Sequence, residues 1–144
     1  NRYKLSGTSD MNIFAYGTLM ISEVMVAVTA REFRFKSAIL EGYARYTVKG
    51  ESYPGIIPVT DAITKGVIYF DVDEWSLERL DAFEGDLYQR TPVQVETEKQ
   101  KILNTQTYVI KPEYQDYLSQ EGWDVKKFIQ KDLEAFLENY QGFQ

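Results

Sequence analysis

The central part of the chain alternates between apolar and polar residues, a pattern typical of strands with one buried face. Residues 92–97 alternate in this way, and residues 102–110 do so again after a polar turn, so we predict a β-hairpin. The apolar run 12–16 predicts a short buried strand that ends at a Tyr-Gly-Thr turn.

A longer strand is predicted over residues 36–49, where Gly42 interrupts the alternation and indicates a β-bulge. The segment 51–59 is interpreted as a turn that enters a short strand, and 65–72 as a further β segment. The chain is therefore rich in strands that follow one another through short turns.

Two shorter helices are predicted from their end signals. Asp73 is a favourable N-cap for a helix over residues 74–84, and Gly85 is a favourable stop. A weaker pattern over 22–29 predicts a short helix with Ser22 as its N-cap.

One longer helix is predicted from Asp124 to Tyr140, because apolar residues recur there at helical spacing. These residues are Val125, Phe128, Ile129, Leu133, Phe136, Leu137 and Tyr140. We interpret this apolar stripe as core and assign no ligand to it.

Many strands and few helices predict an α+β domain on an antiparallel or mixed sheet, with a closed barrel among the forms it allows. No repeat or linker divides the chain, so we expect residues 12–144 to form a single domain. Residues 1–11 are mostly polar and without pattern. We interpret them as a flexible arm or as residues added to a native chain that starts at Met11.

The composition narrows the classes of function. The chain has 144 residues, 44% of them hydrophobic, which is enough for one substantial core. A net charge of −6, without clustered Lys or Arg, argues against a nucleic-acid partner. No apolar run approaches the roughly 18 residues of a membrane helix, and none resembles a secretory signal. We therefore expect a cytoplasmic protein without a membrane partner; the oligomeric state stays open.

The sequence contains neither histidine nor cysteine. Their absence excludes thiol nucleophiles, disulfides, thiolate metal sites and the usual histidine base. If the protein is an enzyme, its proton carrier is therefore Asp, Glu, Lys or Tyr.

Glu84 occupies an unexpected position in the predicted helix 74–84. It continues the stripe of Leu77 and Leu80, where the pattern calls for an apolar residue. Burial and the negative end of the helix dipole would both raise the pKa of this carboxyl, as general acid–base catalysis near neutral pH requires. The alternative interpretation is a frayed helix end with Glu84 in water.

The Tyr-Gly-Thr turn also allows two interpretations. Successive backbone N–H groups of Gly17, Thr18 and Leu19 can form a nest that binds an anion such as a carboxylate. The alternative is an ordinary tight turn. Tyr88, just beyond Glu84, is a candidate hydrogen-bonding partner of a ligand, or else a tyrosine at the rim of the core.

These segments together resemble the gamma-glutamylcyclotransferase-like family, of the gamma-glutamylamine cyclotransferase type. The motifs are "FAYGTL", "LEGYARY", "YPGIIP", "GVIYFDV" and "LERLDAFEGDLYQRTPVQV", in matching order and spacing over residues 12–110. The final helix lies outside the matched region. Thr18 stands where many relatives carry serine, which leaves the backbone N–H groups in place.

The resemblance implies a mixed, mostly antiparallel β-barrel flanked by helices. It implies that Glu84 is the catalytic acid/base and that the substrate lies in the loop Tyr16, Gly17, Thr18 and Leu19. The expected substrate is a small gamma-glutamyl amide, which an acyl transfer within the molecule converts to 5-oxoproline and an amine. No metal or cofactor is implied, and Tyr88 is a candidate for orienting the substrate.

Two other functions are left open by the sequence. A non-catalytic protein could retain the same pocket to bind a glutamyl or amino-acid-like ligand. A protein–protein interaction domain could dock through Phe128, Phe136 and Tyr140 of the C-terminal helix, and burial of these rings within the chain would argue against it. The identity of the leaving amine is also open.

Overall fold

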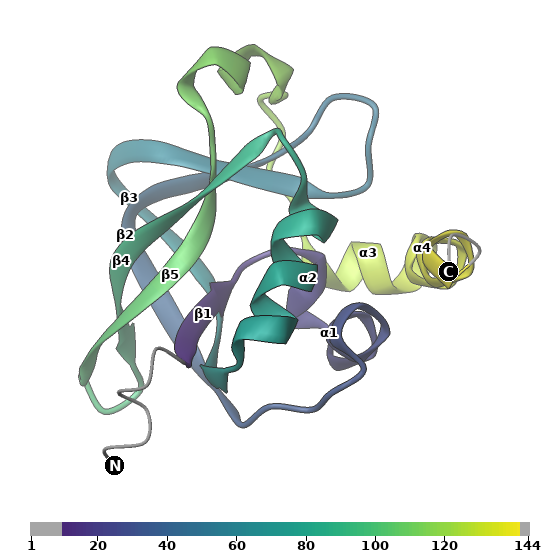
Figure 1. Ribbon diagram of the computed structural model, residues 1–144. Helices are drawn as coiled ribbons and strands as arrows, with labels where there is room; N and C mark the ends of the chain where they lie inside the picture. The colour runs from purple at the N-terminus through teal and green to yellow at the C-terminus, as the bar shows by residue number, and fades with distance from the viewer. Residues whose placement is uncertain (1–9, 142–144) are drawn as a thin grey trace.

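A closed five-stranded β-barrel forms the centre of the computed structural model, which describes residues 10–141 (Figure 1). Around the barrel the strand order is β1-β3-β2-β4-β5, and every pair is antiparallel except the parallel contact of β1 with β5. The strands are β1 (Met11–Ala15), β2 (Phe35–Thr47), β3 (Pro54–Val72), β4 (Tyr88–Thr97) and β5 (Ile102–Ile110). The predicted α+β class and mixed barrel are confirmed. The first strand starts at Met11, within the segment that the sequence interpretation left outside the domain.

The β2–β3 pair contains the predicted bulge. Gly42 has a φ of 88°, and the register of the two strands shifts between Glu41 and Tyr43. Only glycine adopts such a φ readily, so the interruption of the sequence pattern reflects backbone geometry.

The strand β3 is continuous over 19 residues, whereas the sequence predicted a short strand and a separate β segment. The same partner β2 pairs with both parts: Tyr43 lies opposite Pro58, and Glu41 lies opposite Ile63. The extra residues between these pairs include Asp61, whose φ is 68°. The pairing partner therefore unites two segments that local pattern separates.

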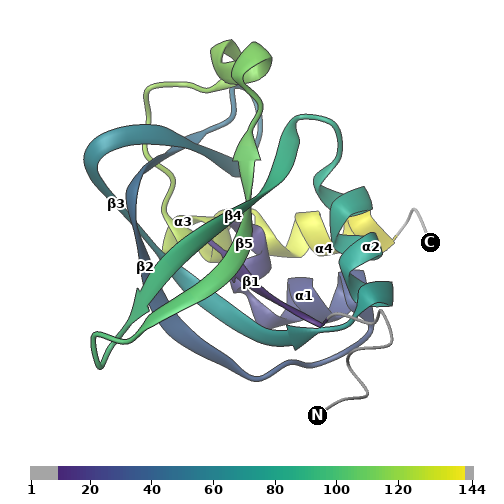
Figure 2. The ribbon, with the colours of Figure 1, turned by 60° about the vertical axis from the view of Figure 1, so that its left-hand side comes forward.

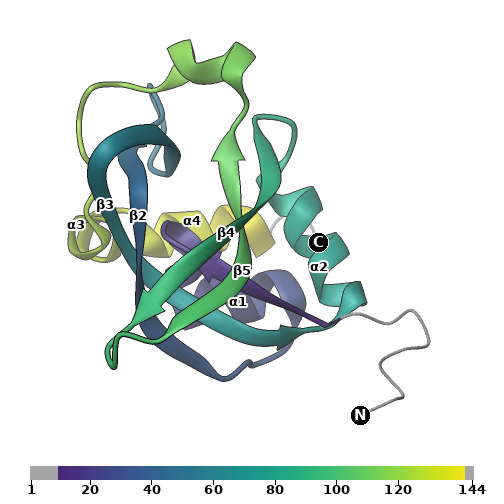
Figure 3. The same ribbon diagram turned by 90° about the vertical axis from the view of Figure 1, so that its left-hand side faces the viewer.

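Four helices lie on one side of the barrel, and the β4–β5 hairpin extends away from them (Figures 2 and 3). They are α1 (Ser22–Thr29), α2 (Glu74–Glu84), α3 (Val125–Lys131) and α4 (Leu133–Gln141), with the 3-10 turns η2 (Thr18–Met20) and η3 (Pro112–Tyr117). Within residues 10–141, no helix has both the length and the apolar composition needed to cross a membrane.

The helix ends confirm one predicted cap and correct another. The Asp73 carboxylate accepts a hydrogen bond of 3.0 Å from the Ser76 N–H at the start of α2, and Gly85 ends the helix with a φ of 80°. At α1 the N-cap is Ile21, and Ser22 is the first helical residue, so the predicted Ser22 cap is wrong. The preceding turn η2 runs directly into Ile21 and fixes its position without a side-chain cap.

The predicted C-terminal helix is interrupted. The helix α3 ends at Lys131 and α4 begins at Leu133, with Asp132 in a non-helical conformation between them. The apolar residues still form one cluster across the break: Phe128 is buried beside Trp123, at 5.8 Å between ring centroids, and contacts Phe136 at 5.5 Å. Phe136 in turn contacts Phe83 at 6.0 Å.

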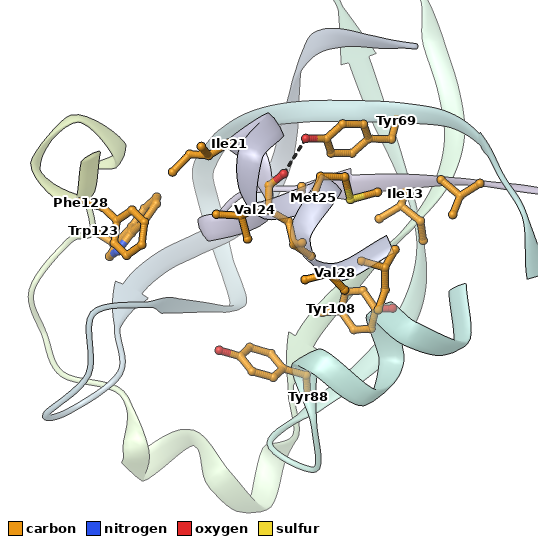
Figure 4. Packing of buried hydrophobic residues seen from close by; sticks show 14 of the residues in the cluster. Ile13, Ile21, Val24, Met25, Val28, Tyr69, Tyr88, Tyr108, Trp123 and Phe128 are labelled. Carbon is orange, nitrogen blue, oxygen red and sulfur yellow. Dashed lines mark hydrogen bonds between the residues drawn. The ribbon is translucent and has the colours of Figure 1, made fainter. Parts of the chain in front are cut away.

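The core has two parts, and β1 contributes to both. Phe14 and Tyr16 pack with residues of the other strands and fill the barrel, while Ile13 and Ala15 face the helices. The second part includes Val24, Met25 and Val28 of α1 (Figure 4). This alternation places the end of β1 between the barrel interior and the helical layer.

Candidate active site

A cavity of about 680 Å³ lies where the end of β1, the end of α2 and the helix α4 meet. Its lining includes all the residues that the sequence assigned to a candidate site: Tyr16, Gly17, Thr18, Leu19, Glu84 and Tyr88. The fold therefore brings together two segments that are more than sixty positions apart in the chain. The volume is in the range of small-molecule sites.

The loop after β1 is fastened at both ends. At its start, the Tyr16 hydroxyl donates a hydrogen bond of 2.6 Å to the Tyr108 carbonyl, and the Arg45 Nη1 donates one of 2.7 Å to the Tyr16 carbonyl. At its other end, the Tyr69 hydroxyl donates a bond of 2.6 Å to the Leu19 carbonyl (Figure 4). These bonds use the Tyr16 hydroxyl and the Tyr16 and Leu19 carbonyls, so none of them uses an N–H group of the loop.

The backbone N–H groups of Gly17, Thr18 and Leu19 donate no hydrogen bond to any group that the structure describes. Gly17 also lies close to Pro54, because an added Cβ would stand 2.9 Å from the proline ring. A glycine is thus needed for this close approach. Free N–H groups beside a cavity favour an anionic ligand group.

Glu84 is the last residue of α2 and lines the cavity. Leu77 and Leu80 of the same stripe are buried, as the sequence pattern predicts. Burial, and to a smaller extent the nearby Asp81, raise the pKa of Glu84 from its ordinary value of 4.5 to about 8. Within residues 10–141 no cation or hydrogen-bond donor contacts its carboxylate, so this acid is available to a ligand.

The other acid of this turn, Asp81, is fully engaged. Its carboxylate accepts a hydrogen bond of 2.6 Å from the Tyr108 hydroxyl and one of 3.1 Å from Arg90 Nε. Arg90 Nη1 also donates to Gln106 at 2.7 Å. The two carboxylates therefore differ in role: Asp81 ties α2 to the barrel, while Glu84 faces the cavity.

Three tyrosines line the same cavity as Glu84 and are neutral hydroxyls. Burial is the main cause that raises the pKa of Tyr16, Tyr88 and Tyr108 well above the usual range, and the charge of Glu84 adds to it. The Tyr88 hydroxyl donates a hydrogen bond of 2.7 Å to the Pro54 carbonyl. Its proton is thus engaged, while its oxygen can still accept a bond from a ligand.

The sequence interpretation missed several residues of the site. Arg45, which holds the loop without lining the cavity, was not recognised, because its acceptors are the backbone carbonyls of Tyr16 and Lys65, which a sequence pattern does not reveal. Phe136 and Tyr140 were assigned to the core, but they also form a wall of the cavity. Further lining residues without a sequence signal are Glu51, Ser52, Tyr53, Asp86, Asp132 and Asn139.

The aromatic rings of the C-terminal helices are used within the chain. Phe128 is buried, and Phe136 and Tyr140 are partly buried against the core, both with edge contacts to Phe83. This packing argues against docking of another protein through these three rings.

No group of three or more Asp or Glu side chains within residues 10–141 has the arrangement of a metal site. The groups that line the cavity include the carboxyl of Glu84, those of Glu51, Asp86 and Asp132, neutral tyrosine hydroxyls and free backbone N–H groups.

Comparison with known proteins identifies one family and relatives that carry the name of that family. The family described as "Gamma-glutamyl cyclotransferase, AIG2-like" matches residues 13–125. AIG2-like protein D of Arabidopsis thaliana is 34% identical over 144 residues, covering 96% of this chain and 93% of that protein. AIG2-like protein C of the same plant is 34% identical over 134 residues, covering 92% of this chain and 77% of that protein.

Solved structures support the same fold. The solution structure of an Arabidopsis thaliana protein has a TM-score of 0.71 at 26% identity and covers 94% of this chain and 82% of its own. A protein described as a gamma-glutamyl cyclotransferase has a TM-score of 0.66 at 17% identity, covering 92% of this chain and 87% of its own, which shows a shared fold. The barrel, the extent of the family match and these relatives lead to one conclusion: the chain belongs to the gamma-glutamyl cyclotransferase, AIG2-like family.

Proposed function

We propose that this protein is a gamma-glutamyl amide cyclotransferase that releases 5-oxoproline and an amine, with Glu84 as the general acid/base. The observation that carries the proposal is the unpaired Glu84 carboxyl with a pKa of about 8, facing a cavity beside three free backbone N–H groups. This combination suits a substrate that carries both an ammonium and a carboxylate, as a gamma-glutamyl group does.

In the proposed complex, the N–H groups of Gly17, Thr18 and Leu19 bind the α-carboxylate of the substrate or polarise its γ-carbonyl. The α-ammonium lies beside Glu84, which removes a proton and frees the nitrogen to attack the γ-carbonyl carbon. Tyr88 is proposed to orient the substrate through its hydroxyl oxygen. All of these groups line the same cavity.

One carboxyl group is sufficient for all the proton transfers of the reaction. A C–N bond forms within the glutamyl unit, and the amide C–N bond to the leaving amine breaks. The attacking nitrogen loses two protons, Glu84 carries each in turn, and both end on the leaving nitrogen, which departs as an ammonium. Because the attack is intramolecular, correct folding of the substrate can lower the barrier by about 7–11 kcal/mol, and no covalent nucleophile is needed.

The first test is to incubate the purified protein with a panel of gamma-glutamyl amides and to measure the 5-oxoproline formed. We expect the wild type to release it from at least one amide, and Glu84→Gln to be slower by about 10²–10⁴-fold. Glu78→Gln, on the exposed side of the same helix, is the matched control and should retain full activity. Binding of the amides without turnover would contradict the proposal and favour a protein that only binds such ligands.

A further inference from the structure

A positive charge lies directly behind the loop that follows β1. Arg45 of β2 donates two hydrogen bonds through Nη1, one of 2.7 Å to the Tyr16 carbonyl and one of 3.0 Å to the Lys65 carbonyl. Its guanidinium also lies over the ring of Trp123, 5.5 Å from the centroid. Trp123 is buried and donates a bond of 2.8 Å from Nε1 to the Ser52 carbonyl. Groups from several separate segments therefore hold the guanidinium in one place.

No acid neutralises the charge of Arg45. None of the ion pairs among residues 10–141 includes Arg45, although the charge of Asp124 favours its guanidinium from a greater distance. Burial lowers the pKa of Arg45 below its ordinary value, but a guanidinium keeps its charge near neutral pH. A half-buried charge without a partner is costly, so an anionic ligand group nearby would stabilise it.

The Tyr16 carbonyl and the Gly17 N–H belong to the same peptide group. Because the peptide bond is conjugated, a charge-assisted hydrogen bond to its oxygen draws electron density from the nitrogen and makes the N–H a stronger donor. Arg45 therefore acts on the Gly17 N–H, a free donor beside the cavity, without lining the cavity itself.

A carboxylate in this cavity needs a compensating positive charge. The described residues that line the cavity include four acids and neither Lys nor Arg. The acids are Glu51, Glu84, Asp86 and Asp132. Ionised carboxyls among them repel an anionic ligand group, and the positive charge of Arg45 behind the loop opposes this repulsion.

We infer that Arg45 is a positioning residue of the site: its guanidinium polarises the Tyr16–Gly17 peptide and so strengthens the Gly17 N–H that binds the α-carboxylate of the substrate. This inference rests on the proposed function for the identity of the ligand. It assigns the α-carboxylate to the loop, in preference to the γ-carbonyl, because a full negative charge gains most from an unpaired cation.

Binding of gamma-glutamyl n-butylamide tests the role of the charge. The amide is titrated calorimetrically into Glu84→Gln, which is expected to bind it without turnover, and into the same protein with Arg45→Lys, Arg45→Gln or Arg45→Met. Lysine and glutamine side chains can both donate to a carbonyl, but only lysine carries the charge. We expect Kd to rise by less than about threefold in Arg45→Lys and by about fivefold to twentyfold in the two neutral variants.

Equal values of Kd in Arg45→Lys and Arg45→Gln would overturn the inference, because the charge would then have no effect on binding. This comparison is sufficient even if Arg45→Met does not fold.

Arg79→Met, also made in Glu84→Gln, is the matched control. Arg79 likewise donates to a backbone carbonyl, that of Val28, and lies over a tryptophan ring, 5.1 Å from the Trp75 centroid. It does not line the cavity, and its carbonyl partner is outside the loop. The Kd of the amide should therefore stay within about twofold of the value for Glu84→Gln alone.

A second ligand separates binding of the carboxylate from the shape of the loop. The n-butylamide of 4-aminobutanoate is the same molecule with hydrogen in place of the α-carboxylate. Its Kd, measured by NMR titration, should differ by less than about twofold between Glu84→Gln and the Arg45 variants made in it. An equal loss of affinity for both ligands would show that Arg45 only maintains the shape of the loop, and would overturn the inference.

Turnover keeps this inference distinguishable from the proposed function. With Glu84 present, Arg45→Gln should raise KM and change kcat by less than about twofold, because the α-carboxylate keeps its charge throughout the reaction. A loss confined to kcat would favour the γ-carbonyl at the loop, and would overturn the inference while supporting the cyclotransferase.

The converse result is equally informative. A Kd that depends on the charge of Arg45, without 5-oxoproline from the wild type, would support the role of Arg45 and contradict the cyclotransferase. Failure of gamma-glutamyl n-butylamide to bind at millimolar concentration would overturn both.

Discussion

The raised pKa of Glu84 carries a cost in stability, and the proposed function would use the same raised pKa for proton transfer. A carboxyl that lies unpaired among buried tyrosines holds its proton until about pH 8, whereas in the unfolded chain it releases the proton near its ordinary value of 4.5. Between these two values the folded state binds more protons than the unfolded state. The free energy of unfolding therefore falls as the pH rises through this window.

We therefore predict that Glu84→Gln is more stable than the wild type above pH 8. The expected gain is roughly 2 kcal/mol, allowing for water in the cavity, and it should vanish near pH 4.5. Urea unfolding of both proteins across this pH range measures it. Glu78→Gln should leave the pH dependence of the wild type unchanged, and a Glu84→Gln variant that is less stable at high pH would contradict the account.

The same carboxyl predicts the pH dependence of catalysis. Glu84 must be ionised to accept a proton, so kcat/KM of the wild type should decline about tenfold per pH unit as the pH is lowered below about 8. A profile of kcat/KM with pH for one good substrate tests this. A flat profile from pH 5 to 8 would show that a different group carries the proton.

Gly17 is the loop residue for which substitution has the clearest expected consequence. In Gly17→Ala the added Cβ would meet the Pro54 ring at 2.9 Å, so the loop must shift and its N–H groups move with it. We expect kcat/KM to fall about tenfold to a hundredfold, since misplaced binding groups lose most of their effect.

The control for Gly17→Ala is Gly122→Ala, because no atom lies within 4 Å of the position that its Cβ would take. It should leave both kcat/KM and the thermal midpoint close to those of the wild type. If the two alanine variants behave alike in activity, the close approach of the loop to Pro54 is not important for function.

At the scale of elements, the proposed role of Glu84 requires α2 to hold this residue at a fixed position. Its start is capped by Asp73, which also accepts a bond of 2.8 Å from the Ser76 hydroxyl and pairs with Arg31 at 2.9 Å. Its end is tied to the barrel through Asp81 and Arg90. Both ends of the helix are thus anchored independently of the cavity.

We predict that Asp73→Ala lowers the free energy of unfolding by about 1–2 kcal/mol, the usual cost of a lost N-cap. Ser22→Ala at α1 is the matched control, because Ser22 is not the N-cap there, and it should change stability by less than about 0.5 kcal/mol. Urea unfolding at neutral pH compares the two. Equal losses would contradict the assignment of the caps.

The elements differ in how far the sequence could predict them. The cap at Asp73, the stop at Gly85 and the bulge at Gly42 follow from residues whose local conformational preference is strong. The continuity of β3 and the break at Asp132 do not, because each depends on packing partners distant in sequence and neither is marked by glycine or proline. Local preference was sufficient only where no tertiary contact overrode it.

At the scale of the whole molecule, closure of the barrel creates the candidate site. The parallel contact between β1 and β5 places the Tyr108 carbonyl within hydrogen-bond distance of the Tyr16 hydroxyl. The helices α2 and α4 contribute Glu84 and a further wall to the same cavity. The sequence pattern placed Glu84 and the loop as candidates. It could not show that α4 lines the cavity, since an apolar helical stripe indicates that a face is buried but not which residues it packs against.

We propose that the assembled cavity cyclises a gamma-glutamyl amide with the help of Glu84. The most direct measurement quantifies 5-oxoproline, glutamate and free amine released from one amide by the wild type and by Glu84→Gln. We expect equal amounts of 5-oxoproline and amine from the wild type, no glutamate, and a rate for Glu84→Gln that is lower by at least about a hundredfold. Release of glutamate in place of 5-oxoproline, or an undiminished rate in Glu84→Gln, would contradict it.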